Sequence, residues 1–211
     1  MLKERITRVL ESTNKKSYLK WYCKSDLVNR IHWQGVRILK FVPDLWNYQE
    51  IISDYKITNV IEFGSFLGGS TIFFADILKI YQTGGKTLSV DIVDKWDPKT
   101  NRTDIQKLKA SSISDTCRIT VKKFREENPG NVLVILDSEH TGEHIYKELQ
   151  LITPLLKKGD YLIVEDADDD PRIIVAMKKF FGENPLEYEY DKTREEKFGV
   201  TAALYGYWIK K

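Results

Sequence analysis

The sequence contains few cysteines and histidines, the residues that form the disulfides of small secreted proteins and the ligands of zinc sites. It has two cysteines, Cys23 and Cys117, which lie far apart and outside any C-x-x-C pair, and only three histidines in 211 residues. Two isolated cysteines suit reduced thiols better than a disulfide framework or a zinc site. The cysteine usage therefore argues against a disulfide-dependent fold.

Long apolar runs and a strong net charge are also missing. Charged residues interrupt the apolar positions of the opening segment MLKERITRVLESTNKK, which is unlike a signal peptide, and no later stretch approaches the length of a membrane span. Lys and Arg total 33 against 31 Asp and Glu, so the net charge is +2. This lacks the excess of basic residues expected of a protein that binds nucleic acid or an anionic membrane. We expect a cytoplasmic protein that binds neither nucleic acid nor a membrane.

Short β-rich runs alternate with helical stretches along the chain, which at 42% hydrophobic and 30% charged residues reads as one globular domain. The strands are predicted at 59–64, 87–92, 131–137 and 161–167, and the helices at 70–81, 114–128, 141–156 and 170–182. Strands that are continuous in Val, Ile and Leu are expected to be covered on both faces. The pattern predicts an α/β fold, a Rossmann-like doubly wound and mostly parallel sheet.

The two ends of the chain depart from this alternation. The runs LEYEYDK and TAALYGYWIKK, joined by the charged segment TREEKFG, predict an antiparallel hairpin on the sheet edge with no helix between its strands. Residues 1 to about 40 predict a helical leader. Such a leader would cover a pocket or pair with a second subunit in a homo-oligomer.

The segment IEFGSFLGGST follows the first strand and is rich in glycine. Gly64, Gly68 and Gly69 would allow a tight turn and close approach to a ligand. Ser70 is predicted to cap the next helix, whose free N–H groups would face an anion. Asp91, at the end of the second strand, can accept hydrogen bonds from a ribose diol. Together these residues predict a nucleoside-containing cofactor, the alternative being a structural turn and a strand-end acid.

The spacing of the glycines bears on which cofactor binds. The dinucleotide pattern G-x-G-x-x-G needs a glycine two positions after the first, whereas Gly64 is followed by Ser65 and Phe66. With Glu62 before it, the loop is more similar to the E-x-G-x-x-x-G loop of methyltransferases that depend on S-adenosylmethionine (SAM). The predicted C-terminal hairpin is similar to the antiparallel strand that such enzymes add to a doubly wound sheet.

Three acids stand at the ends of strands predicted to be neighbours, namely Asp137, Glu165 and Asp166. Adjacent strands lie about 4.8 Å apart, so these carboxylates would converge and repel one another unless a cation shares the site. Oxygen ligands alone suit Mg²⁺. Using both Glu165 and Asp166 requires the chain to be turning out of its strand there, and a solvated acidic loop without metal is the alternative.

His140 lies three residues after Asp137 in the segment VILDSEH. An imidazole there can take a proton from a substrate hydroxyl near neutral pH, which makes His140 the candidate general base. The alternative is a structural loop histidine. His144, on the following helix, is expected to be a structural or surface residue.

These residues belong to a wider resemblance that runs from about Trp33 to the C-terminus. It rests on WQG, KFVPDLWNYQEII, IEFGSFLGGST, VDI, VILDSEHTGEHIYKEL, YLIVEDA and GYWIK. The chain resembles the cephalosporin hydroxylase and rhamnosyl O-methyltransferase family, which is similar to the metal-dependent macrolide sugar O-methyltransferases. The resemblance implies a SAM-dependent methyltransferase domain over 41–211 behind the leader of 1–40.

The resemblance also implies the roles of single residues. Mg²⁺ would be held by Asp137, Glu165 and Asp166, with His140 as the general base. The residues implied to bind the cofactor are Glu62, Gly64, Ser65, Gly69, Ser70, Asp91, Ser111, Ser112 and Asp137. Ser111 and Ser112 would contact the adenine, although Ala110 stands in LKASSIS where a glycine is common. The implied acceptor is a hydroxyl of a sugar, in a glycoside or a polysaccharide, and a catechol-like aromatic would also fit.

Two other function classes stay open at this point. One is an oxidoreductase, either a hydroxylase of the cephalosporin type or a nicotinamide enzyme. A non-haem iron oxygenase would want two histidines and one carboxylate, and a nicotinamide enzyme would want tighter glycine spacing. The other is a SAM-binding regulatory module, which would have no need of His140 beside the acids.

Overall fold

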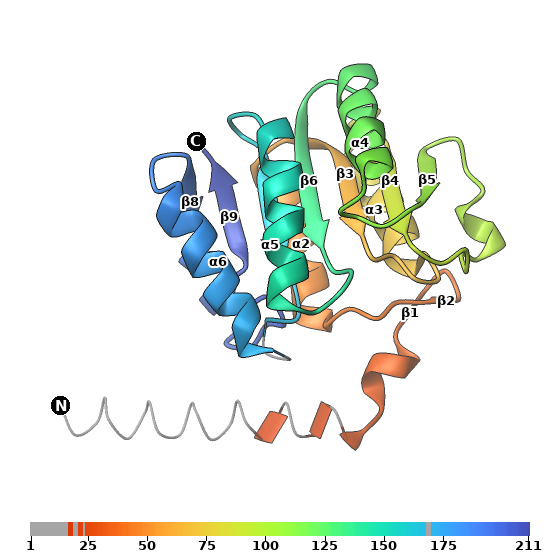
Figure 1. Ribbon diagram of the computed structural model, residues 1–211. Coiled ribbons are helices and arrows are strands. Elements are labelled where there is room, and N and C mark those ends of the chain that lie inside the picture. Colours follow the sequence, from red (N-terminus) through yellow and green to blue (C-terminus); the bar gives the residue numbers. More distant parts are fainter. Residues whose placement is uncertain (1–16, 19–20, 23, 168–169) are drawn as a thin grey trace.

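The computed structural model describes residues 17–18, 21–22, 24–167 and 170–211. Its main sheet has seven strands in the order β5-β4-β3-β6-β7-β9-β8 (Figure 1). Their bounds are β3 (Ile57–Phe63), β4 (Thr87–Asp91), β5 (Ile105–Lys109), β6 (Asn131–Leu136), β7 (Tyr161–Val164), β8 (Tyr188–Tyr190) and β9 (Tyr207–Lys210). The first five pair in parallel and β9 runs antiparallel between β7 and β8. The predicted fold class, including the hairpin at the sheet edge, is confirmed.

Helices cover both faces of the sheet (Figure 1). One layer holds α4 (Asp115–Glu127), α5 (Gly142–Ile152) and α6 (Pro171–Glu183), and the other holds α2 (Val42–Asp54) and α3 (Gly69–Ile80). Successive strand residues point to opposite faces, so Val134 packs in the core under α4–α6 while Ile135 packs in the core under α2 and α3. Both faces of the sheet are buried under helices, which explains why the strand sequences are continuous apolar runs.

Side chains cap the N-termini of α4, α5 and α6. Ser114, Thr141 and Asp170 accept hydrogen bonds from backbone N–H groups in the first turns of α4, α5 and α6. Helix α3 differs, because its N-cap is Gly68 at φ 80° and Ser70 lies inside the first turn. The predicted capping role of Ser70 is therefore wrong; its buried side chain hydrogen-bonds Glu62 instead.

Two further elements correct the predictions for the second half of the chain. Strand β5 was not predicted, because its segment IQKLK lies on the sheet edge and has only one buried residue, Ile105. A short helix, α7 (Lys192–Glu196), stands between β8 and β9, where the sequence predicted none. Asp191 caps this helix, and Arg194 pairs from it with Glu50 on α2. The charged segment thus folds against the body of the protein.

Only part of the predicted helical leader, residues 1 to about 40, lies within the described residues. Residues 1–16, 19–20 and 23 lie outside the described residues. Residues 27–30 form a 3₁₀ helix, η1 (Leu27–Arg30). Within 32–37 the prediction is wrong, because these residues form a two-stranded hairpin of β1 (His32–Trp33) and β2 (Val36–Arg37). The Trp33 indole donates to Asp76 on α3 at 2.7 Å, so the hairpin is fastened to the helix that follows the glycine loop.

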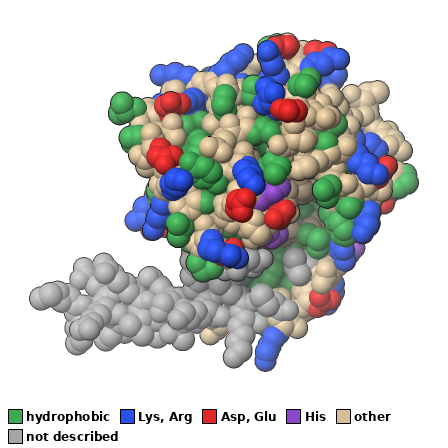
Figure 2. All heavy atoms as spheres, viewed as in Figure 1, with side chains coloured by type: hydrophobic (Ala, Val, Ile, Leu, Met, Phe, Trp, Pro, Cys, Tyr) green, Lys and Arg blue, Asp and Glu red, His purple; other side chains and the backbone are tan. Residues whose placement is uncertain are grey.

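The described residues contain no helix long and apolar enough to cross a membrane. Acidic and basic side chains are interspersed over the face of the molecule seen in Figure 2. Two shorter turns, η2 (Pro98–Thr100) and η3 (Thr153–Leu155), complete the elements.

Candidate functional site

The ends of three neighbouring strands set the geometry of the site. Phe63 of β3 pairs with Leu136 of β6, and Leu136 pairs with Val164 of β7. The next residue of each strand therefore lies at one level above the sheet, and these residues are Gly64, Asp137 and Glu165. This register brings the glycine loop beside the two acids, at the carboxyl edge where open parallel sheets bind ligands.

A cavity of about 720 Å³ opens at this edge, a size typical of ligand sites. Its walls come from the leader segment and the start of α2, the glycine loop, the end of β4, the loops after β6 and β7, and the segment before β9. The residues include Tyr22, Arg37, Leu39, Lys40, Phe41, Gly64, Ser65, Phe66, Ser70, Asp91, Asp137, His140, Asp166 and Thr201. A smaller cavity of about 140 Å³ adjoins it, and Gly64, Asp91 and Ser138 line both. The two together form one site with a wide and a narrow part.

Asp91 organises the glycine loop as well as facing the cavities. Its Oδ2 accepts a hydrogen bond from the backbone N–H of Phe66 at 2.6 Å, and its Oδ1 accepts one from Val93 at 2.9 Å. Phe66 itself has φ 48°, a left-handed conformation that is unusual for a bulky residue. The carboxylate stabilises this turn and remains on the wall between the two cavities.

The predicted cofactor residues divide by position. Those lining the main cavity are Gly64, Ser65, Ser70, Asp91 and Asp137, and those lining the smaller one include Ser111 and Ser112. Glu62 and Gly69 line neither. Glu62 is buried beneath the loop and accepts a hydrogen bond from Thr71 at 2.9 Å. Gly69 is needed for packing, because a Cβ there would lie 2.2 Å from the carbonyl oxygen of Arg37.

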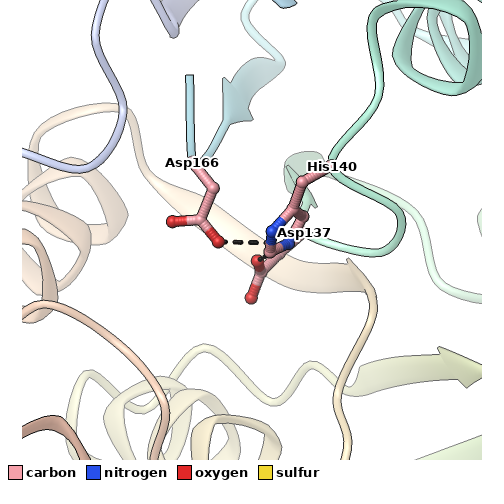
Figure 3. Close-up of side chains that lie close together, drawn as sticks. All are labelled: Asp137, His140 and Asp166. Carbon is pink, nitrogen blue, oxygen red and sulfur yellow. Dashed lines mark ion pairs between the residues drawn. The ribbon is translucent and has the colours of Figure 1, made fainter. Parts of the chain in front are cut away.

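Asp137, His140 and Asp166 converge at the edge of the main cavity (Figure 3). His140 Nε2 lies 3.3 Å from Asp137 Oδ1 and 3.1 Å from Asp166 Oδ2. One ligand atom from each residue lies within 4.8 Å of the others, a spacing that a divalent cation can close by small side-chain movements. Asp166 has φ 54°, so the chain does turn out of β7 at this point. The two carboxylates fit a metal ion, and the imidazole lies beside them.

Glu165 points elsewhere. Its Oε1 accepts a hydrogen bond from the Tyr48 hydroxyl at 2.7 Å and lies 3.0 Å from the Lys40 ammonium. Burial, and then the charges of Asp137 and Asp166, raise the pKa of Glu165 despite the opposing charge of Lys40. Among the described residues the cluster of candidate metal ligands comprises Asp137, His140 and Asp166, without Glu165.

Lys40 is the principal residue of the site that sequence reasoning missed. Its side chain is 2% exposed, and Nζ lies 2.5 Å from Asp137 Oδ2 and 3.4 Å from Glu62 Oε1. Burial alone would lower the pKa of Lys40, but the charges of Asp137, Glu165 and Glu62 outweigh it and raise the pKa well above its usual value. Burial likewise opposes ionisation of Asp137, yet Lys40 and His140 hold the pKa of Asp137 below its usual value. Both groups stay charged.

A polar network forms the wall of the smaller cavity. His144 Nε2 lies 2.9 Å from the Ser112 hydroxyl and 3.4 Å from Glu148 Oε1, and the Ser138 hydroxyl donates to the same Glu148 oxygen at 2.5 Å. Glu148 is fully buried. These partners agree with the expectation that His144 is a structural or surface residue, although the sequence did not predict the partners themselves. The i, i+4 spacing of His144 and Glu148 on a helix could have revealed the pair.

The fold and the site together define a Rossmann-like α/β protein with a class I methyltransferase topology, in which a glycine loop and converging acids share one cavity. A family model described as "Rhamnosyl O-methyltransferase/CmcI" matches residues 25–211. The chain belongs to this family.

A curated relative and two solved structures illustrate the similarity. The rhamnosyl O-methyltransferase of Mycobacterium leprae (strain TN) is 37% identical over 206 residues, covering 93% of this chain and 90% of the relative. An apo structure of CmcI matches with a TM-score of 0.69 at 18% identity, covering 86% of this chain and 76% of that one. A CmcI structure with Mg and SAM matches with a TM-score of 0.68 at 17% identity, covering 87% and 77%. At such low identity the structures support the fold.

Proposed function

We propose that this protein is a SAM- and Mg²⁺-dependent O-methyltransferase that acts on a sugar hydroxyl. The single observation that carries the proposal is the meeting of Asp137, His140 and Asp166 at the edge of the cavity that the glycine loop lines. Membership of the rhamnosyl O-methyltransferase family supports the reaction, and the CmcI structure with Mg and SAM supports the cofactors. The sugar acceptor follows from the names of the relatives.

The cofactor is proposed to occupy both cavities. The homocysteine end would lie along the glycine loop, near Gly64 and Ser65, and the ribose would lie beside Asp91. The adenine would enter the smaller cavity, where Ser111, Ser112, Ser138 and His144 form the wall. Glu62 and Gly69, which line neither cavity, would hold the loop and the first turn of α3 in place, and Ser70 would hydrogen-bond Glu62 from the wall of the main cavity.

Bound SAM would supply the methyl group on its sulfonium, and bound Mg²⁺ would supply positive charge that makes the acceptor hydroxyl more acidic. Asp137 and Asp166 are proposed to hold the metal, with Glu165 as the third proposed ligand from its place beside Asp166. In the transfer, the acceptor oxygen would form a bond to the methyl carbon while the carbon–sulfur bond broke with its electron pair on sulfur, and His140 would accept the proton. Lys40, held in its charged form, cannot take that proton, which favours His140 as the base.

The acceptor is proposed to enter past the leader segment. Tyr22, Leu39 and Phe41 line the main cavity, and the rings of Tyr22 and Phe41 meet edge to face at 4.7 Å. Aromatic and aliphatic groups can cover the apolar face of a sugar ring while its hydroxyls turn towards the acids. The cytoplasmic location, the division at residue 40 and a homo-oligomer formed through the leader stay predictions.

The oxidoreductase alternative gains no support from the geometry. Within the described residues, the candidate ligand cluster has one histidine and two carboxylates, whereas a facial triad for non-haem iron has two histidines and one carboxylate. His144 cannot supply the second histidine, because it lies in the smaller cavity against Ser112 and Glu148. A SAM-binding module without chemistry would leave His140 beside the acids without a purpose.

Two measurements test the proposal. Titration calorimetry should show binding of SAM or S-adenosylhomocysteine in the low micromolar range or tighter and no binding of NADH. Incubation with methyl-labelled SAM, Mg²⁺ and a panel of rhamnosides and catechols should then label a sugar acceptor. Binding of NADH without SAM would contradict the assignment of the cofactor, and labelling of catechols alone would contradict the acceptor class.

A further inference from the structure

Lys40 brings a buried positive charge into the group of acids at the strand ends. Its ammonium lies within 3.4 Å of three carboxylates, those of Glu62, Asp137 and Glu165. Glu62 and Glu165 are buried as deeply as Lys40, at 0% and 3% exposed. Burial disfavours the charged forms of such carboxyl groups, and ionised carboxylates this close would repel one another without a cation between them. Lys40 supplies that cation from outside the strands, on the leader segment just before α2.

The two oxygens of Asp137 face two different positive partners. Oδ2 accepts a hydrogen bond from Lys40 at 2.5 Å, while Oδ1 faces His140 in the candidate metal cluster. Lys40 and a metal ion would therefore share one carboxylate without competing for the same oxygen. One ammonium and one divalent cation would carry three positive charges among the four carboxylates of Glu62, Asp137, Glu165 and Asp166.

We propose that Lys40 is an internal counter-cation, a positioning residue that keeps Asp137 and Glu165 in place while the metal is absent. Its charge also lowers the affinity of the site for the metal. This inference rests on the proposed Mg²⁺ site. Lys40 carries part of the neutralisation permanently, so the protein stays folded through cycles of metal and ligand exchange. Without Lys40, the metal ion would have to neutralise the acids alone.

The proposal has a consequence for stability that an ordinary buried ion pair does not share. In a Lys40→Met variant the acids of the metal-free protein face one another without a cation, so the thermal midpoint should fall. Mg²⁺ should bind this variant about tenfold more tightly than wild type, because a nearby positive charge has gone. A ligand that binds the folded state more tightly stabilises it more, so the Mg²⁺-induced rise of the midpoint should be larger in the variant.

The experiment is a thermal unfolding series in buffer with EDTA and in buffer with excess MgCl₂, together with calorimetry of MgCl₂ binding in the absence of SAM. Lys40→Arg, which keeps the charge, should respond to MgCl₂ as wild type does. Arg125→Met is the matched control, because Arg125 and Asp160 form a buried ion pair of 2.6 Å before the start of β7. Its midpoint should fall by the same amount with and without MgCl₂.

The outcomes separate the inference from the function on which it rests. A Lys40→Met variant that loses equal stability in both buffers, or that binds Mg²⁺ no more tightly than wild type, would overturn the role of Lys40 and leave the metal site standing. Failure of wild type to bind Mg²⁺ would overturn the metal site and this inference with it. Should Lys40→Met not fold in EDTA, refolding in excess MgCl₂ is expected to recover it, and no recovery would count against the proposal.

Discussion

Gly64 lies directly against the backbone of Asp137, where β3 and β6 end side by side. A Cβ added to Gly64 would sit 1.8 Å from the carbonyl oxygen of Asp137, and Gly64 has φ 85°. The first glycine of the loop therefore does more than allow a turn. It lets the strand that carries the loop approach the strand that carries the acid, and so joins the cofactor part of the site to the metal part.

Gly64→Ala should destabilise the protein by more than about 4 kcal/mol or prevent folding, because the added methyl group meets backbone that cannot move aside. Gly84→Ala is the control, since Gly84 also has a left-handed φ of 69° but nothing lies within 4 Å of its added Cβ. That variant should lose only about 1–2 kcal/mol through backbone strain. Urea unfolding of both variants measures the difference, and equal losses would show that φ alone requires the glycine.

His140→Ala should fold, bind SAM and Mg²⁺, and lose about 10² to 10⁴ in the rate of methyl transfer, the usual contribution of a positioned base. Single-turnover kinetics with an acceptor that the panel identifies would measure it. His32→Ala, at an exposed histidine on β1, serves as the control and should keep its activity. Activity of His140→Ala within a few fold of wild type would mean that solvent removes the proton.

Asp166→Asn should abolish Mg²⁺-dependent turnover and leave the SAM affinity nearly unchanged, because Asp166 lies in the candidate metal cluster and is not among the residues proposed to bind SAM. Treatment of wild type with EDTA should have the same effect, and added MgCl₂ should reverse it. Asp115→Asn, at an acid exposed on α4, controls for the loss of a negative charge. Methyl transfer that proceeds unchanged in EDTA would show that the acids do not form a metal site.

The His144–Glu148 pair should make stability depend on pH. The hydrogen bond to Glu148 raises the pKa of His144 above its ordinary value of 6.5, with the charge of Glu148 and the exposed Glu139 adding to it and burial and Lys147 opposing it. A raised pKa in the folded state contributes stability that is complete below about pH 6.5 and is lost as the pH rises through the folded pKa. The difference in unfolding free energy between wild type and His144→Gln should therefore be larger at pH 6 than at pH 9. Urea unfolding at a series of pH values tests this, and a difference independent of pH would contradict the assignment.

Local signals in the chain predicted most of the fold. The alternation of continuous apolar strands with amphipathic helices predicted the parallel sheet, because a strand covered on both faces has no polar positions. Local sequence signals did not predict the elements whose structure depends on packing against distant parts of the chain. The edge strand β5 is rich in charge, the short helix α7 depends on a contact between Arg194 and Glu50, and the hairpin at 32–37 is held by Trp33 against α3.

The candidate site divides in the same way. The position of Gly64 and Asp137 at strand ends, with His140 three residues beyond, can be read from the chain, because a strand ends where its apolar run stops. The folded protein is needed to show that Lys40, 97 residues from Asp137, enters the group of acids. It also shows that Asp166 turns towards His140 while Glu165 turns towards Lys40 and Tyr48. Ion pairs form between side chains that are close in space, and the periodicity of a sequence does not predict which distant side chain will neutralise a given acid.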